Sequence, residues 1–342
     1  MMKFRRFIPA VLLLASLCAV SCKDKDEPEE VKASMLGNIN IVYPEYVAPG
    51  MAKSFKIDTM STLHRTDDVK IGYYVTNPTT GDRDTIIFDG GKANPSFPDG
   101  KYTFTAPSDL GSYSLSITGY SAEYYTKTAT AKFVVVSPAL DGTGSLTGLE
   151  FGSSDPTFTD PRDRSIYYVT KVGNKEWMRQ NLVWKGLGTS FEGCEAMDPI
   201  FGRFYTWEEA GSACPEGWRL PSDSDWAELA SAYAENAAGS GDIAGVAGKL
   251  MANASFNGEM MWTYWPAVKI TDESRLSAIP VGYAGADGNG FKFNGLNDYF
   301  LCWTSDEEDG QGVYRYIYVS QDVLFKGTGD KTMMAAPVRC VR

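Results

Sequence analysis

Between residues 34 and 137 the chain alternates short apolar runs with polar turns. Seven segments are β-branched or alternate apolar with polar positions, and Gly, Pro and Asp residues separate them: 39–43, 54–57, 69–75, 85–88, 100–105, 111–120 and 126–136. A period of two is typical of strands with one buried face, and strands so closely spaced are typical of an antiparallel sandwich. The pattern therefore predicts an all-β domain over residues 34–137.

After residue 159 the pattern predicts helices as well as strands. Thr206 precedes two acidic residues, and Pro215 stops the helix that they would begin. Ser222 is a second candidate N-cap, with Asp225 at the third helical position and an apolar face leading toward Glu235. This face consists of Trp226, Leu229 and Tyr233.

Residues 313–319 alternate as a half-buried strand, in a phase that we expect to turn Arg315 toward water. Residues 138–158 are rich in Gly, Ser, Thr and Asp and lack apolar periodicity. Such a composition predicts a linker between the two domains.

The first 21 residues have the order of an export signal: basic residues, an apolar run over 7–17, and small residues before Cys22. The apolar run is shorter than the roughly 20 residues that cross a bilayer. Residues 17–22, LCAVSC, resemble a lipobox, and the charged segment 23–30 resembles the export tether of surface lipoproteins in Bacteroidota. We expect cleavage after residue 21, lipid on Cys22 as a membrane anchor, and an acidic tether over 22–33; the alternative is an ordinary secretory signal with an incidental cysteine.

The formal net charge of −11 disfavours nucleic acid as a partner, since no basic stripe occurs that could offset it locally. Tryptophan is confined to residues 177–303, which separates a tryptophan-rich second half from a first half without any. This contrast supports two domains.

An ordered set of motifs marks the second half. The segments are 177–182 (WMRQNL), 202–207 (GRFYTW), 213–222 (ACPEGWRLPS), 276–283 (LSAIPVGY), 302–305 (CWTS) and 338–342 (VRCVR). Together they resemble the Fibrobacter succinogenes major paralogous domain over residues 159–342. That family is similar to C-type-lectin-like folds and to formylglycine-generating enzymes, which implies an α+β domain. Residues 100–107 and 111–118 resemble late strands of immunoglobulin-like or PKD-like modules. The fold class expected is an immunoglobulin-like sandwich followed by a lectin-like domain.

Four cysteines in an exported domain should be oxidised, and three pairings are open. The lectin-like resemblance implies a Cys214–Cys340 bridge and leaves Cys194 to pair with Cys302. Zinc is disfavoured because no CxxC spacing occurs and the one histidine, His64, lies in the other domain.

Little in the sequence indicates catalysis. A single histidine and the lack of GxSxG, phosphate-binding and HExxH motifs argue for a protein without enzymatic activity. An Asp/Glu glycosidase or an enzyme related to formylglycine-generating enzymes is the alternative, and a structural subunit of a surface assembly is a third possibility.

Two features favour binding. Trp262, Trp265, Tyr283 and Tyr299 lie in segments rich in Gly and Asn, where rings can stack on sugars or belong to the core. Asp306, Glu307 and Asp309 could offer oxygen ligands to Ca²⁺ or form a solvated turn; the sugar-binding triplets of calcium-dependent lectins are missing. We expect a lipoprotein of the outer membrane that faces the cell exterior and binds a glycan or a surface protein.

Overall fold

The computed structural model describes residues 31–37, 39–40, 45–57, 62, 70–77, 81, 83–89, 101–149, 151–234 and 241–342. The predicted signal peptide, Cys22, most of the tether and His64 lie outside these residues. Within them, no helix combines the length and the apolar character needed to cross a membrane.

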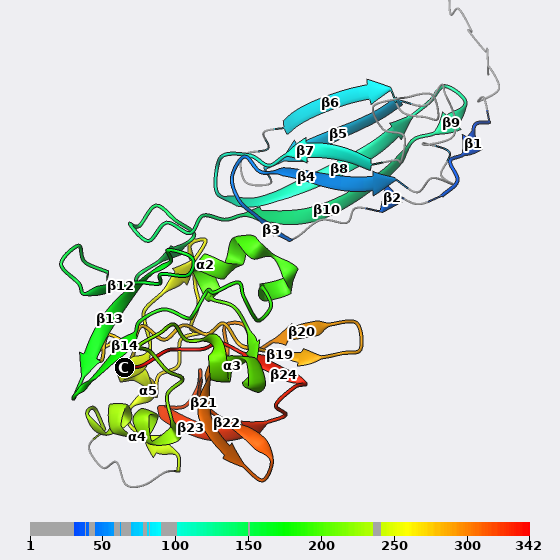
Figure 1. Ribbon diagram of the computed structural model, residues 1–342. Coiled ribbons are helices and arrows are strands. Elements are labelled where there is room, and N and C mark those ends of the chain that lie inside the picture. The colour runs from blue at the N-terminus through cyan, green and yellow to red at the C-terminus, as the bar shows by residue number, and fades with distance from the viewer. Residues whose placement is uncertain are drawn as a thin grey trace, which may run out of the picture.

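The N-terminal part is built from two facing sheets (Figure 1). Each of the seven predicted segments overlaps a strand. The larger sheet has the order β3 (Tyr46–Val47), β10 (Lys127–Val135), β8 (Gly111–Tyr120), β5 (Lys70–Thr76) and β6 (Arg83–Asp89). The smaller has β2 (Ile39–Asn40), β4 (Ala52–Ile57) and β7 (Lys101–Thr105), and β1 (Ala33–Ser34) pairs with β9 (Tyr124–Tyr125).

Apolar side chains from both sheets fill the space between them. Phe104 of the smaller sheet packs edge-on against Phe133 of the larger one, with ring centroids 5.7 Å apart. Leu115 and Ile117 of β8 are fully buried in the same cluster. In β8 and β10, the alternation in the sequence thus places Leu115, Ile117 and Phe133 inside.

As far as the structure describes it, the C-terminal part combines short helices with four small sheets. One sheet has the order β16 (Ile243–Ala244), β23 (Val323–Gly329), β22 (Gln311–Tyr318) and β21 (Tyr299–Glu308). A second has β15 (Tyr205–Thr206), β24 (Met334–Ala336), β19 (Tyr283–Ala286) and β20 (Phe291–Asn294). The three-stranded sheets are β12 (Thr157–Thr159), β13 (Ile166–Val172) and β14 (Lys175–Met178), and β11 (Leu146–Thr147), β17 (Ser255–Phe256) and β18 (Glu259–Met260).

Both predicted helices are present, each with a reciprocal cap. Thr206 and Glu209 form the capping box of α3 (Trp207–Ala213), and Ser222 and Asp225 form that of α4 (Asp223–Ser231). Helix α4 is shorter than predicted, since it ends at Ser231 rather than near Glu235. The remaining helical turns are α2 (Asp198–Phe201), α5 (Ala247–Leu250) and the 3-10 turns η1 (Phe191–Gly193) and η2 (Glu195–Met197).

The segment expected to be a linker, 138–158, packs on the C-terminal part. Strand β11 pairs with β17, and Leu146 is buried in a cluster of that part. Tyr46 of the sandwich reaches the same cluster and lies 6.0 Å from Phe191 and 6.2 Å from Phe256, centroid to centroid. Aromatic packing therefore joins the two parts.

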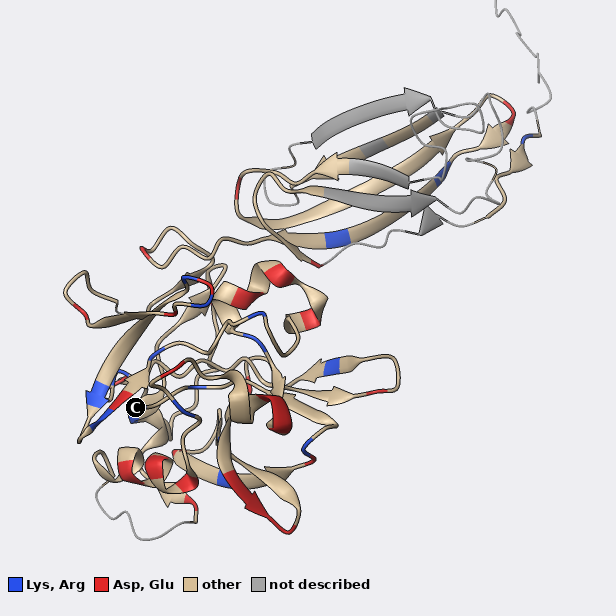
Figure 2. Ribbon diagram, in the orientation of Figure 1, with Lys and Arg blue, Asp and Glu red and all other residues tan. Residues whose placement is uncertain are grey.

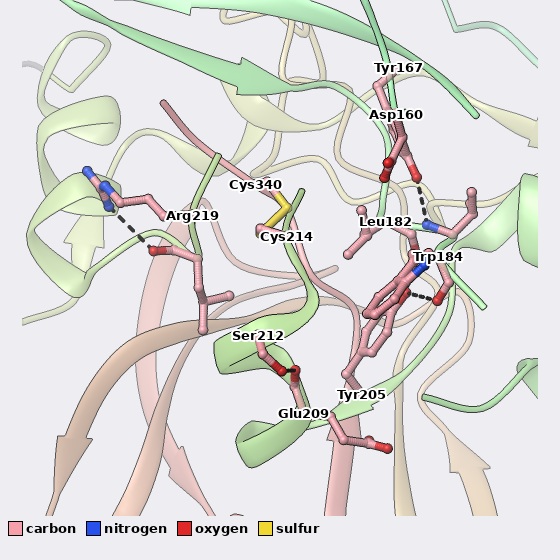
Figure 3. The surroundings of a disulfide bond; sticks show 12 residues. Asp160, Tyr167, Leu182, Trp184, Tyr205, Glu209, Ser212, Cys214, Arg219 and Cys340 are labelled. Atoms are coloured by element: carbon pink, nitrogen blue, oxygen red, sulfur yellow. Dashed lines mark hydrogen bonds between the residues drawn. A yellow bond between two sulfur atoms is a disulfide. The ribbon is translucent and has the colours of Figure 1, made fainter. Parts of the chain in front are cut away.

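The cysteines follow the resemblance in one pair and depart from it in the other. Cys214, directly after α3, is bonded to Cys340 in the last segment of the chain (Figure 3). The predicted Cys194–Cys302 pairing is wrong: both are buried free thiols, and they belong to different apolar clusters. The two sulfur atoms therefore lie in separate parts of the core.

Candidate ligand-binding site

The sheet formed by β21, β22 and β23 has two apolar faces of different character. Its inner face is buried against α4, where Phe300 meets Trp226 with ring centroids 6.0 Å apart. Its outer face carries the half-buried rings of Tyr314, Tyr316 and Tyr318, at alternate positions of β22. Because side chains alternate across a strand, these three rings share one face.

The expected orientation of Arg315 was wrong. Its side chain lies on the inner face with no exposed surface, and its Nε donates to Asp223 Oδ1 at 2.6 Å. A buried cation needs such a partner, and the first residue of α4 supplies it. The strand and its period of two are as predicted, but the arginine points inward and the tyrosines point outward.

A hollow of about 240 Å³ opens on the outer face, and we call it the tyrosine hollow. Its lining residues are Tyr283, Tyr299, Leu301, Tyr314, Tyr316 and Met334. They come from β19, β21, β22 and β24, so strands of two different sheets contribute. Two of the four predicted aromatic ligand residues, Tyr283 and Tyr299, are brought together here.

The rings of the hollow stand at steep angles to one another. Tyr283 and Tyr299 are 6.2 Å apart with an interplanar angle of 84°. Tyr316 lies 6.1 Å from Tyr299 at 45° and 5.8 Å from Tyr314 at 57°. The four rings therefore form the walls of a concave surface.

Glycine makes room for two of these rings. A Cβ atom at Gly327, opposite Tyr314 on β23, would come within 2.6 Å of the Tyr314 ring. A Cβ atom at Gly295, whose φ is +73°, would come equally close to the ring of Tyr299. The positions of both rings therefore depend on residues without a side chain.

The phenol groups of the hollow are available for hydrogen bonds to a ligand. The hydroxyls of Tyr283, Tyr299, Tyr314 and Tyr316 make no hydrogen bond to any described residue. Burial first, and then neighbouring tyrosines, raises the pKa of Tyr299 and of Tyr314. The phenols are therefore protonated at neutral pH, able to donate hydrogen bonds and to offer ring surface, and unsuited to exchange protons.

The two predicted tryptophans lie elsewhere. Trp262 is 1 % exposed and its Nε1 donates to the carbonyl of Ala278, so it belongs to the core. Trp265 is 43 % exposed and Tyr264 is 82 % exposed, beside a separate hollow of about 340 Å³. The aromatic residues proposed from sequence thus divide between two sites.

Two of the three predicted calcium ligands of the β21–β22 hairpin already have partners within the chain. Asp306 Oδ2 accepts the backbone N–H of Asp223 at 2.6 Å, and Glu307 pairs with Lys331. Figure 2 shows this acidic stretch at the end of the molecule away from the sandwich. Over the described ranges, no three His, Cys, Asp or Glu side chains are grouped as a metal ion requires. Calcium binding at Asp306, Glu307 and Asp309 stays a prediction.

Sequence reasoning missed Tyr314 and Tyr316. Their signal was present, since tyrosines occupy every second position from 314 to 318. An Arg315 that faces water would turn these tyrosines inward, so the expected orientation of the arginine hides the rings. Only the position of Asp223 in the structure reveals which side is outside.

Comparison with known proteins identifies the C-terminal part. The model of the Fibrobacter succinogenes major domain family matches residues 170–342, which include the whole tyrosine hollow. No curated protein matches the chain. Among solved structures, the adhesin InvE of Yersinia pseudotuberculosis is similar at 12 % identity with a TM-score of 0.25, over 91 % of this chain and 71 % of that one.

Proposed function

The chain belongs to the Fibrobacter succinogenes major domain family, and on that premise we propose that it is a cell-surface binding protein without enzymatic activity. Its ligand is a surface glycan or protein, and the tyrosine hollow is where that ligand is bound. The observation that carries the proposal is the hollow itself: four half-buried tyrosine rings face one concavity with unpaired hydroxyls.

Tyrosine suits such a role for physical reasons. Its ring supplies a large apolar contact, its hydroxyl supplies a hydrogen bond, and it has few rotatable bonds to immobilise on binding. The contacts among Tyr283, Tyr299, Tyr314 and Tyr316 hold the rings in place before any ligand arrives, which lowers the entropic cost of association. The lining holds no group that titrates near neutral pH, which supports binding over acid–base catalysis.

In the same proposal, lipid on Cys22 anchors the protein in the outer membrane, facing outward. The sandwich is an immunoglobulin-like spacer, and the C-terminal part is a lectin-like head. Strands β21 to β23 lie at the end of the molecule away from the sandwich (Figure 1), an arrangement that would present the hollow far from the anchor. Replacing Cys22 by Ala should move the protein from the membrane fraction to the soluble fraction, and protease treatment of intact cells tests the orientation.

The binding test uses the full chain in detergent against arrays of glycans, mucins and surface proteins. We expect retention of at least one class of ligand, and loss of that binding in Tyr299→Ala and Tyr316→Ala. Tyr264→Ala is the matched control, because that ring is 82 % exposed and lies outside the hollow. Loss of binding in Trp265→Ala with normal binding in Tyr316→Ala would move the site to the second hollow and refute the proposal.

A further inference from the structure

We propose that the tyrosine hollow is an aromatic cage for an organic cation of the quaternary ammonium class. This inference rests on the proposed function and specifies the chemical group that the hollow would recognise. It follows from the angles between the rings, the charges around them and the absence of the cation–π contacts that cover other aromatic rings of the described chain.

The geometry of the rings favours binding of a compact chemical group over stacking of a flat one. Sugars stack on aromatic faces, and an extended glycan is best served by neighbouring rings that share a plane. With angles of 84°, 45° and 57° between them, successive rings of the hollow do not share a plane, so the hollow suits a compact group carried by the ligand better than the flat face of a sugar chain. Rings inclined to one another around one hollow, with adjacent centroids about 6 Å apart, offer aromatic surface to a compact group from more than one side.

The size of the hollow agrees with a small organic cation. Its volume of about 240 Å³ greatly exceeds the roughly 15 Å³ that one water molecule needs in the same measure. Leu301 and Met334 complete the lining with apolar surface, which suits the methyl groups of a quaternary ammonium. Such a cation carries no N–H donor, so it needs no hydrogen-bond acceptor in the wall.

The charges that act on the rings are negative. Carboxylates contribute to the raised pKa of two phenols: Asp242 acts on Tyr316 after the larger effect of burial, and Asp298 acts on Tyr299 after burial and the neighbouring tyrosines. The lining itself contains neither Lys nor Arg. A cation entering the hollow would therefore meet ring quadrupoles and a favourable field, in a protein whose net charge is −11.

Elsewhere the protein covers aromatic faces with cations of its own. Arg162 lies 4.0 Å over the ring of Trp184. Arg342 lies 4.6 Å over Trp218, and Lys331 lies 4.5 Å over Trp207. For the tyrosines of the hollow, the described part of the chain supplies no such cation. The rings of the hollow, although Tyr316 stacks on Phe325 and Tyr299 lies against Tyr318, are thus not paired with a cation from the described residues.

The test measures binding of choline to the full chain by calorimetry, beside its neutral carbon isostere, dimethylbutanol. The two molecules have nearly the same shape, so their difference reports the charge. We expect choline to bind about tenfold more tightly, as a cation–π contribution of roughly 1 to 2 kcal/mol implies. Equal affinity for both, or binding of neither, would overturn the proposal.

Two variants at one position separate the ring from its hydroxyl. Tyr316→Leu removes the π face and should weaken choline binding about tenfold, whereas Tyr316→Phe keeps the face and should bind within about threefold of the natural protein. Equal losses in both variants would contradict a cage. The thermal unfolding midpoint of each variant shows whether it is folded, and the comparison of choline with its isostere on the natural protein needs no variant.

Further measurements distinguish a free cation from a lipid headgroup, and failure of the cage from failure of the proposed function. Phosphocholine in solution and vesicles of phosphatidylcholine, with phosphatidylglycerol vesicles as the control, show whether a free or a lipid-borne headgroup is taken; binding of either supports the cage. If a glycan or protein ligand is retained through Tyr316 while choline neither binds nor competes, the cage is refuted and the proposed function stands.

Discussion

The Cys214–Cys340 disulfide should supply much of the stability of the C-terminal part. The two cysteines are 126 residues apart, so the bond closes a long loop in the unfolded chain. Loop-closure entropy for this length amounts to about 5 kcal/mol at 25 °C, which is the maximum expected when the native geometry is unstrained. We expect the reduced protein to be less stable than the oxidised protein by about 4 to 5 kcal/mol.

The measurement is chemical denaturation of oxidised and reduced protein, followed by tryptophan fluorescence, which reports this part alone because all tryptophans lie there. Reduction keeps every side-chain atom, so it isolates the cross-link. The double variant Cys214→Ala, Cys340→Ala should lose about 1 kcal/mol more than reduction does, because Cys340 is fully buried and its replacement leaves a small void. A loss below about 1 kcal/mol on reduction would refute the loop-entropy argument.

Three further predictions concern buried groups. Cys194 and Cys302 should resist alkylation at pH 8 in the native protein, because burial raises the pKa of both thiols, that of Cys302 to about 12. Both should react once the protein is denatured without reductant, and mass spectrometry counts the alkyl groups on each. If neither cysteine is labelled after denaturation, the two form a second disulfide. In Tyr46→Ala, loss of the aromatic joint should raise the labelling rate of Cys194 about tenfold and leave that of Cys302 unchanged, which corresponds to about 1.4 kcal/mol of local opening. Burial alone would raise the pKa of Asp225, but hydrogen bonds from Arg219 and Ser222 hold that pKa well below its usual range. The stabilisation that the Asp225 carboxylate contributes is therefore present above about pH 4 and is lost on further acidification. Asp225→Asn should lower the free energy of unfolding at pH 7 by about 1 to 2 kcal/mol and flatten this acid dependence, as measured by urea titration at several pH values.

Local chemistry made several elements predictable. The capping boxes at Thr206 and Ser222 are contained within four residues each, so the helix starts could be found without knowledge of the fold. Seven of the ten strands described in the N-terminal part could be predicted for a similar reason, since alternation and turn residues are local signals; the two-residue strands β1, β3 and β9 are too short to show a period. The end of α4 could not be predicted, because the residues after Ser231 carry no strong stop signal and their packing decides where the helix ends.

The candidate site was only half visible in the sequence. Tyr283 and Tyr299 were proposed for their aromatic character, but Trp262 was proposed on the same ground and is a core residue bonded to Ala278. Residue type alone cannot separate these cases. Both have large rings in segments rich in small residues, and the difference is the presence of other chain segments above Trp262.

What the sequence by itself determined is what neighbouring residues decide: the strand periods, the helix caps, the motif order of the family and the cysteine after α3. The tertiary structure decided which face of β22 looks outward, through the carboxylate of Asp223 some 92 positions away from Arg315. It also kept Cys194 and Cys302 apart and assembled four tyrosines from three strands of two sheets. Burial and contact at long range depend on how the segments pack together, and no local pattern records that packing.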